Sequence, residues 1–315
     1  MTGVSLREQF RTSPDVVFMQ RYQFKKIDAF VEGQSTGNPA GCVYLPDENA
    51  LSVEGMQQIA RELAGFVSEV VYVYPEEGYT ALRFFSSERE VAFCGHATIA
   101  VMYDLIKNDP ERARNPVSRI HVQGRELLVR NEIASADAVF ISAPPPHFLD
   151  FTRTRDDIAA ALRIPPGELT EKNRIMLVNA GLATLIVPIT SLETLLSLRP
   201  DQKHLREFCL ANGIEIILVF SEDVSIKTNN YRSRVFAPIY GYLEDPATGS
   251  GNAALGYYLL NANLWDGHML RIEQGRSRER PNIIRLVSDA SKVQRSVFFG
   301  GNAKVRIEGE YLLYP

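Results

Sequence analysis

Two segments far apart in the chain carry a glycine turn that leads directly into an apolar run. The first is FCGHATIAVMYDLI (93–106) and the second is EDPATGSGNAALGYYLL (244–260). When Gly95 is placed over Gly249, an alanine and a tyrosine further along each run also coincide. Because the strands and helices predicted around the two segments follow the same order, the pattern indicates an internal duplication. Such a chain is expected to fold as two similar α/β halves, with a small-molecule site at their junction.

Hydrophobic periodicity predicts the elements around these turns. Residues 22–31 alternate as in a strand, residues 51–65 have helical spacing, and the β-branched and aromatic residues of 68–88 predict a hairpin. After the Gly-His pair at residues 95 and 96, apolar residues recur at helical spacing. A helix is therefore expected to begin at this pair.

The length of 315 residues exceeds the usual size of one compact core and favours two domains. Residues 1–20 are polar and aperiodic, which is typical of an N-terminal extension. The triple proline at 144–146 marks the predicted boundary between a first half (21–143) and a second half (144–296). A C-terminal strand around residues 297–315 is expected to pack back on the first half.

The overall charge shows no basic footprint. The chain has 34 Lys and Arg, 38 Asp and Glu and a formal net charge of -4, so nucleic acid is not an expected partner. No segment approaches the roughly 20 apolar residues that cross a bilayer, and the first residues lack the apolar core of a signal peptide. We therefore expect a cytoplasmic protein with no membrane partner.

Metal and cofactor motifs are missing from the sequence. Cys42, Cys94 and Cys209 form no CxxC pair, and the histidines stand at no metal-ligand spacing, so neither a disulfide framework nor a metal site is expected. The sequence also lacks GxxxxGK[ST] and a GxGxxG turn that follows a strand. We therefore expect no cofactor.

The glycine turns are candidates for anion binding. The start of a helix leaves backbone N–H groups unpaired and adds the positive end of the helix dipole, which favours a carboxylate or phosphate. In the simpler alternative, the glycines only turn the chain and Ser250 and Asn252 only cap a helix.

Two acids are candidates for proton transfer. Glu69 interrupts the apolar run VSEVVYVY, where burial would raise its pKa into the range that suits a general acid or base. Alternatively, Glu69 lies on the solvated face of an edge strand. Asp245 directly precedes the second glycine turn, where its side chain either forms an Asx turn or points into the site.

Several motifs together resemble the phenazine biosynthesis PhzF-like family. They occur in family order from about residue 22 to the C-terminus, and the CGHAT and EDPATGS motifs are the most specific of them. The motifs are STGNPAGCVYL (35–45), SEVVYV (68–73), RFFSSEREVAFCGHAT (83–98), EDPATGSGNAAL (244–255), EQGRSRERPNII (273–284) and FGGNAKVRIEGEY (299–311).

The resemblance implies an α+β fold of the diaminopimelate epimerase type. In this fold each of two pseudo-symmetric halves wraps a sheet around a central helix, the active site lies in the cleft between them, and the protein is often a homodimer. It also implies a proton shift on a small carboxylate substrate without metal or cofactor. Glu69 would be the catalytic base, with His96 and Asp245 as its catalytic partners. The implied substrate-binding residues are Asn38, Gly95, Ala97, Thr98, Gly249, Ser250 and Gly251.

Departures from related patterns keep two alternatives open. The epimerase relatives use two cysteines as paired bases, but Cys94 has Thr248 as its counterpart, so a two-thiol racemase is disfavoured. A racemase that combines Glu69 with Cys94 remains an alternative, as does a non-catalytic binding member. Ser86-Ser87 replaces a common Thr-Pro pair, and RSRERP replaces a Met-Gly-Arg-Pro turn, which is expected to alter the substrate pocket.

Overall fold

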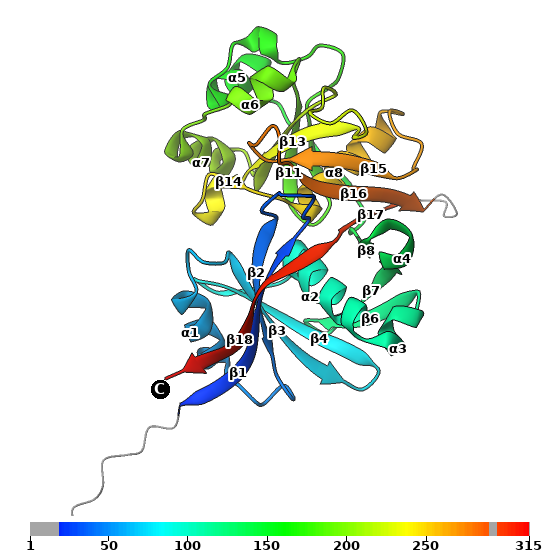
Figure 1. Cartoon of the computed structure of the whole chain (residues 1–315). Coiled ribbons are helices and arrows are strands. Elements are labelled where there is room, and N and C mark those ends of the chain that lie inside the picture. Colours follow the sequence, from blue (N-terminus) through cyan, green and yellow to red (C-terminus); the bar gives the residue numbers. More distant parts are fainter. Residues whose placement is uncertain (1–18, 290–294, 315) are drawn as a thin grey trace, which may run out of the picture.

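The computed structural model describes residues 19–289 and 295–314. The predicted N-terminal extension (residues 1–20) lies outside the described residues except for residues 19 and 20. The first strand begins at Gln20. Figure 1 shows the described chain as two lobes, each with one central helix. These helices are α2 (Gly95–Asn108) and α8 (Gly249–Asn261), so the prediction that a helix begins at each glycine turn is confirmed.

The strands of the first lobe form a sheet around α2. A two-residue strand, β5 (Glu90–Val91), pairs with one end of β4, directly before α2. In spatial order the sheet contains β18 (Ala303–Leu313), β1 (Gln20–Ala29), β2 (Asn38–Tyr44), β3 (Glu69–Glu76), β4 (Tyr79–Ser86), β6 (Val117–Val122), β7 (Arg125–Glu132) and β8 (Ala138–Ser142).

The strands of the second lobe follow the same plan around α8. The two-residue strand is here β14 (Glu244–Asp245), which pairs with β13 directly before α8. In spatial order the sheet contains β9 (His147–Leu149), β10 (Met176–Asn179), β11 (Ala183–Pro188), β12 (Ile216–Ser221), β13 (Tyr231–Phe236), β15 (Leu270–Gln274), β16 (Asn282–Asp289) and β17 (Ser296–Gly301). The parallel pairs β11–β12 and β13–β15 match β2–β3 and β4–β6 in the first lobe.

Shorter helices cover the outside of the two lobes. In the first lobe they are α1 (Val53–Glu62), α3 (Pro110–Arg114) and α4 (Ile133–Ala136). In the second lobe they are α5 (Arg155–Leu162), α6 (Leu192–Ser197) and α7 (Gln202–Ala211), with the 3₁₀ turns η1 (Pro166–Glu168) and η2 (Pro238–Tyr240).

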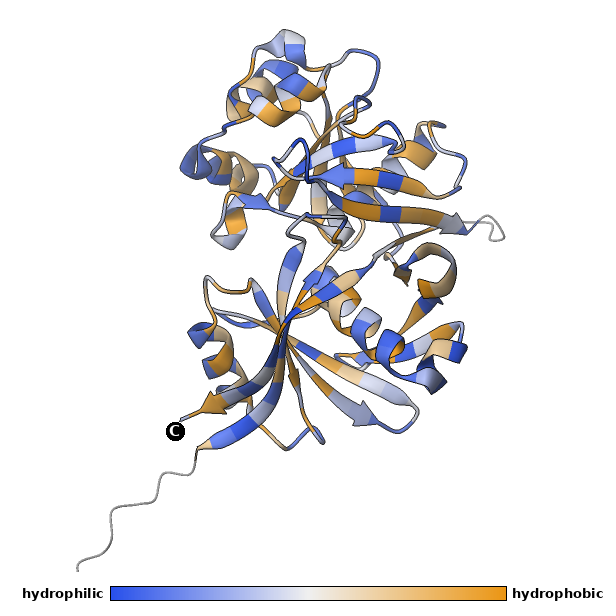
Figure 2. Ribbon diagram, in the orientation of Figure 1, coloured by the Kyte–Doolittle hydropathy of each residue, from blue (hydrophilic) through white to orange (hydrophobic). Residues whose placement is uncertain are grey.

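One sheet and one hydrophobic core join the lobes. Strand β17 pairs with β16 of its own lobe and with β8 of the other lobe. The largest buried apolar cluster contains side chains from both central helices. Figure 2 shows hydrophilic and hydrophobic residues alternating along many of the surrounding strands, as expected for strands with one face on the core. The fold is therefore a mixed α/β arrangement with no break in the core between the lobes.

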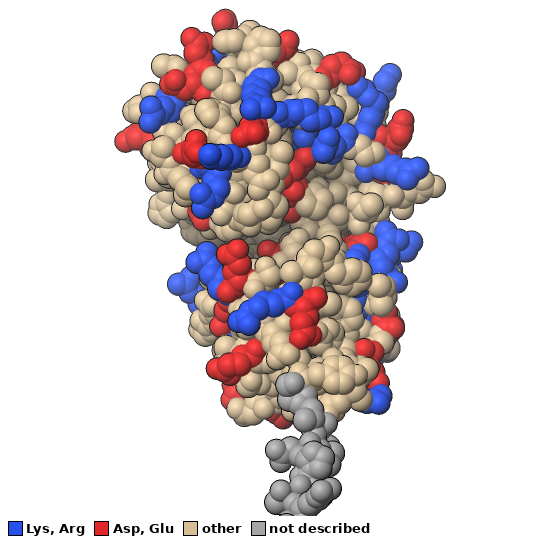
Figure 3. All heavy atoms as spheres, turned by 90° about the vertical axis from the view of Figure 1, so that its left-hand side faces the viewer, with Lys and Arg blue, Asp and Glu red and all other residues tan. Residues whose placement is uncertain are grey.

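The surface carries both signs of charge. On the face shown in Figure 3, basic and acidic side chains are interspersed over both lobes. Every described helix is too short or too polar to span a lipid bilayer.

The ring of Phe299, on β17, lies against the first residues of both central helices. A Cβ atom added at Gly249 would lie 2.4 Å from this ring, and one added at Gly95 would lie 3.1 Å from it. Phe299 is almost completely buried, so it has little room to move aside. The two glycines are therefore required by the close approach of the helix starts to one aromatic ring.

We expect Gly249→Ala to destabilise the protein by about 1 to 3 kcal/mol, because overpacking would displace the ring of Phe299. Gly95→Ala should cost less, since its closest contact is longer. Urea unfolding measures both effects. Gly309→Ala on β18 is the control, because an added Cβ there meets nothing within 4 Å. A Gly249→Ala protein as stable as this control would contradict the prediction.

Candidate active site

Glu69 is the first residue of β3, between β2 and β4. Its side chain is 17% exposed, and its Oε2 atom is buried without a hydrogen-bond partner among the described residues. Burial, reinforced by the negative charge of Asp245, raises the pKa of Glu69 to about 7. A carboxyl group that is unpaired and ionises near neutral pH has the properties of a general base.

His96 lies in the first turn of α2 and faces Glu69. Its Nε2 atom is 3.4 Å from Oε2 of Glu69, and its Nδ1 atom is 3.4 Å from Sγ of Cys94. Burial lowers the pKa of His96 to about 4, although a hydrogen bond to the backbone of Pro39 opposes this shift. The imidazole is therefore neutral near pH 7 and can exchange a proton or hydrogen bond with Glu69 without forming an ion pair.

Asp245 is the second residue of β14 and is buried. Its Oδ1 atom accepts a hydrogen bond from Nδ2 of Asn38 at 2.8 Å, and its Oδ2 atom accepts one from the hydroxyl of Thr248. Burial raises the pKa of Asp245 to about 7, and these two hydrogen bonds only partly offset the rise. The site therefore holds a second carboxyl group that titrates near neutral pH.

Asn38, the first residue of β2, connects the lobes at this point. Its Nδ2 group also donates to the carbonyl of Ala247 at 2.8 Å. Its Oδ1 atom is buried and has no hydrogen-bond partner among the described residues. Buried polar atoms are normally paired, so this oxygen and Oε2 of Glu69 are two unusual acceptors that the described residues leave without a hydrogen-bond donor.

A polar scaffold holds the chain that carries Asp245. The side chain of Gln274 accepts from Thr248 N (3.0 Å) and Asn252 Nδ2 (2.7 Å), and it donates to the carbonyl of Asp245 (2.9 Å). Asn282 accepts from the backbone N–H of Gly37 and donates to the carbonyl of Pro246, both at 2.8 Å. These residues fix the turn before α8 from two directions.

The two lobes place different side chains at equivalent positions. Counting along the paired strands, Asp245 is equivalent to Val91, and Glu69 is equivalent to Ile216. Each lobe therefore contributes one carboxyl group, from β3 in the first lobe and from β14 in the second. The strand arrangement is repeated in the two lobes, but the carboxyl groups are at different positions in it.

Both central helices begin without a side-chain cap. The residues at the N-caps, Cys94 and Thr248, have nearly equal backbone angles, and neither side chain makes a capping hydrogen bond. The hydroxyl of Thr248 is instead bonded to Asp245. Uncapped N–H groups and the helix dipole make both starts suitable for an anion.

The predicted substrate-binding residues of the first turns differ in what they can offer. Ala97 and Thr98 are completely buried, and both donors of Thr98 bond the carbonyl of Cys94. Gly251 faces Ile216 on β12. Only the partly exposed Ser250 carries a side chain that can reach a ligand. At Ala97 and Gly251, binding would use the backbone.

Cys94, Glu69 and His96 each place one potential metal-binding atom within 4.8 Å of the others. The pKa of the Cys94 thiol lies well above its ordinary value, because of burial and the negative charge of Glu69. The thiol of Cys94 is therefore protonated near neutral pH.

Thr248, Gln274 and Tyr242 belong to the site but were not predicted from sequence. Burial and then the charges of Asp245 and Glu69 raise the pKa of Tyr242 well above its ordinary range, so its hydroxyl stays protonated. Tyr242 and Thr248 flank Asp245 in the sequence, which is a usable signal. Gln274 comes from a strand 29 residues further along the chain than Asp245, and no local pattern marks it.

The family model for phenazine biosynthesis-like protein (PhzC-PhzF) matches residues 27–309. The chain belongs to the PhzC-PhzF family. This assignment confirms the resemblance seen in the sequence motifs. A relative, an uncharacterized isomerase of Clostridium acetobutylicum, is 32% identical over 310 residues, which cover 94% of this chain and 99% of the relative.

Solved structures share the fold. A PhzF family protein of Bacillus anthracis superposes with a TM-score of 0.81 at 22% identity and covers 93% of this chain and 100% of that structure. A hydroxyproline epimerase of Agrobacterium vitis with bound trans-4-hydroxy-L-proline superposes with a TM-score of 0.56 at 11% identity and covers 93% of this chain and 92% of that structure. The PhzC-PhzF fold is thus shared with an epimerase whose ligand is a small carboxylic acid.

Proposed function

We propose that this protein is a cofactor-independent isomerase that moves a proton on a small carboxylate substrate. The observation that carries the proposal is the pair of carboxyl groups, Glu69 and Asp245, contributed by different lobes and both with pKa values of about 7. Groups with such pKa values take and return protons efficiently near neutral pH. The relatives named as isomerases support the reaction class.

Glu69 acts first as the base. Its carboxylate takes a proton from a carbon near the substrate's carboxylate, and the electron pair of the broken C–H bond moves into the substrate as an enolate. The protonated Glu69 exchanges its proton with solvent and then protonates another carbon of the substrate. His96 and Tyr242 stay neutral in this cycle, so neither adds a charge beside the acids.

The developing negative charge lies against the starts of α2 and α8. Preorganised hydrogen-bond donors of this kind contribute roughly 2.7 to 4 kcal/mol each to a transition state that gains negative charge. We place the substrate between the lobes, in contact with both helix starts. The ligand class of the hydroxyproline epimerase, a small carboxylic acid, supports this placement.

A screen of small carboxylates in D₂O tests the proposed function. It does not require the product of the reaction to be known. The protein should introduce deuterium into at least one compound, as measured by NMR and mass spectrometry. Glu69→Gln is the paired control and should introduce deuterium about 10² to 10⁴ times more slowly. A protein that binds carboxylates tightly but never exchanges a proton would instead be a non-catalytic binding member of the family.

We expect Cys94→Ala to retain most of the exchange activity. The thiol is protonated near neutral pH, and its counterpart Thr248 offers no second thiol. The measurement is the exchange rate of the variant, together with the rate of the parent protein after thiol alkylation. Removing a catalytic acid or base usually lowers the rate by at least about 100-fold. A fall of this size in the exchange rate of folded Cys94→Ala would favour the racemase that uses Glu69 with Cys94.

A further inference from the structure

A matching arginine–glutamate pair lies beside the two-residue strand of each lobe. In the second lobe, Nε and Nη2 of Arg234 donate to Oε1 and Oε2 of Glu244, both at 2.8 Å. In the first lobe, Nε and Nη2 of Arg83 donate to Oε1 and Oε2 of Glu90, both at 2.9 Å. Both pairs are the planar two-bond arrangement that gives an arginine–carboxylate contact its fixed direction.

The surroundings of the two pairs match as well. Each arginine lies over the ring of a phenylalanine two residues later, with Arg83 5.4 Å from the Phe85 centroid and Arg234 5.0 Å from the Phe236 centroid. Each phenylalanine pairs through the backbone with the glutamate of its own lobe. The two lobes therefore repeat a three-part clamp of arginine, glutamate and phenylalanine.

The clamp lies directly behind Asp245 in the second lobe. Glu244 and Asp245 are consecutive residues of a strand, so their side chains point to opposite faces of the sheet. A strand of two residues has few backbone hydrogen bonds to fix its direction. Holding Glu244 from behind therefore fixes the direction in which Asp245 points.

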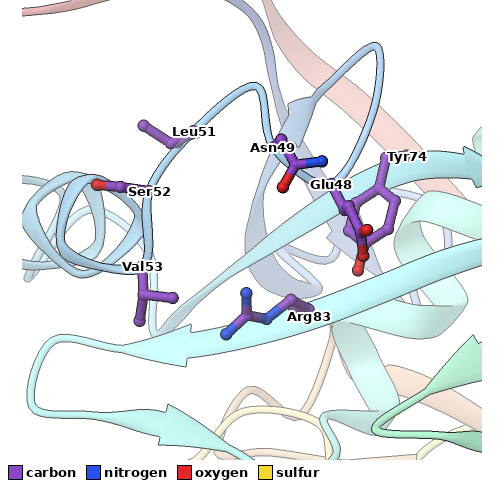
Figure 4. Close-up of a pocket in the computed structure, with 7 residues that line it drawn as sticks. All are labelled: Glu48, Asn49, Leu51, Ser52, Val53, Tyr74 and Arg83. Carbon is purple, nitrogen blue, oxygen red and sulfur yellow. The ribbon is translucent and has the colours of Figure 1, made fainter.

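The clamp of the second lobe is far more enclosed than its counterpart. Arg234 is 1% exposed, and its Nη1 group also donates to the carbonyls of Leu195 and Leu198 at the end of α6. In the first lobe Arg83 instead borders an open pocket of about 510 Å³, shown in Figure 4. The pocket is lined by Glu48, Asn49, Leu51, Ser52, Val53, Tyr74 and Arg83.

We propose that Arg234 and Glu244 are positioning residues that keep the side chain of Asp245 directed toward the candidate active site. The proposal rests on the proposed role of Asp245. The pair in the first lobe is a matched control, because Glu90 is followed by Val91 and so holds no acid.

The clamp also affects the protonation of Asp245. The negative charge of Glu244 contributes to the raised pKa of Asp245. The other ionisable groups that act with Asp245 are Glu69 on β3, Cys94 before α2, and Tyr242 on the preceding loop. None of these is changed by a substitution in the clamp, so a shift in the titration of Asp245 reports on the clamp.

Difference infrared spectroscopy tests the proposal without a substrate. The carboxyl band that is lost in Asp245→Asn identifies Asp245, and its amplitude is followed against pH. We expect Glu244→Gln to lower the midpoint, because it removes a nearby negative charge and leaves the cations of Arg234 and Arg276 without this partner. Glu90→Gln should leave the midpoint unchanged. An unchanged midpoint in folded Glu244→Gln, or an equal shift in Glu90→Gln, would overturn the proposal.

Arg234→Lys keeps the assay informative where Glu244→Gln fails to fold. Lysine retains the positive charge but cannot form the two parallel hydrogen bonds. We expect kcat for deuterium exchange to fall by about 10-fold or more, which corresponds to a small loss of alignment. KM should change less than threefold, because a misdirected Asp245 affects the reaction more than substrate binding. Arg83→Lys should leave kcat unchanged. Equal kcat values for Arg234→Lys and the parent would contradict the positioning role. If no substrate undergoes exchange, the infrared titration of Arg234→Lys decides the question, because the charges of the clamp are kept and a shifted Asp245 midpoint then reports a moved carboxyl group.

Discussion

Replacing Glu69 by glutamine should lower the rate of deuterium exchange by about 10² to 10⁴-fold, the usual contribution of a general acid or base. The amide has nearly the same shape as the carboxyl group but cannot accept a proton from carbon. Because Oε2 of Glu69 has no hydrogen-bond partner among the described residues, the substitution removes no existing hydrogen bond at this atom. The expected loss is therefore chemical and not structural.

The control for this substitution is on the same strand. Glu76 lies at the other end of β3, is 45% exposed and pairs with His121 at 2.7 Å, so Glu76→Gln should exchange at the parental rate. Full turnover by Glu69→Gln would show that another group is the base. Asp245 would then be the next candidate, because it also titrates near pH 7.

The pH dependence of exchange tests whether the base is a group that titrates near pH 7, a property that Glu69 shares with Asp245. Glu69 must be ionised to act as the base, so kcat/KM should rise with pH and level off above its pKa of about 7. His96, with its pKa lowered to about 4, stays neutral over this range and should add no further step near pH 7. A profile that is flat from pH 5 to 8 would exclude Glu69 as the ionising base.

The sequence predicted those parts of the site that have a local cause. A glycine turn followed by a helical period predicts the start of a helix, and both α2 and α8 begin at the predicted glycines. The apolar run around Glu69 is compatible with both a buried and a solvated carboxyl group, and the structure shows the side chain 17% exposed. Each of these patterns is contained within a few residues.

The remaining parts depend on contacts between distant segments. Gln274 bonds the turn before α8 because β15 pairs with β13, and that pairing follows from the topology of the whole lobe. Asn38 reaches Asp245 across 207 residues of chain. No local pattern specifies which polar atoms meet over such separations, so the hydrogen-bond partners of the acids required the structure.

The repeat explains why one half of the site could not be inferred from the other. Both lobes preserve the glycine turn, the arginine–glutamate clamp and the central helix, which are features of the scaffold. The reactive positions have diverged, because Glu69 is matched by Ile216 and Asp245 by Val91. The repeated arrangement of strands and helices thus offers two equivalent sets of positions, and the proposed reaction uses a different member of each set.

The free energy of unfolding should depend on pH because the pKa of Glu69 differs between the folded and unfolded states. Its pKa is raised from 4.5 to about 7 in the folded protein, so between these values the folded state binds more protons than the unfolded state. Stability therefore falls as pH rises from about 4.5 to about 7 and then levels off, by about 3 kcal/mol in total for this group. Glutamine carries no such ionisation cost.

We therefore expect Glu69→Gln to be more stable than the parent protein by about 3 kcal/mol at pH 8 and nearly equal to it at pH 4.5. Urea unfolding at several pH values measures the difference, and Glu76→Gln should follow the parent throughout. A constant difference at every pH would mean that burial does not penalise the ionised form of Glu69. The combination of lower activity with higher stability at pH 8 would identify Glu69 as a residue kept for its chemistry, because a structural role predicts a loss of stability on substitution.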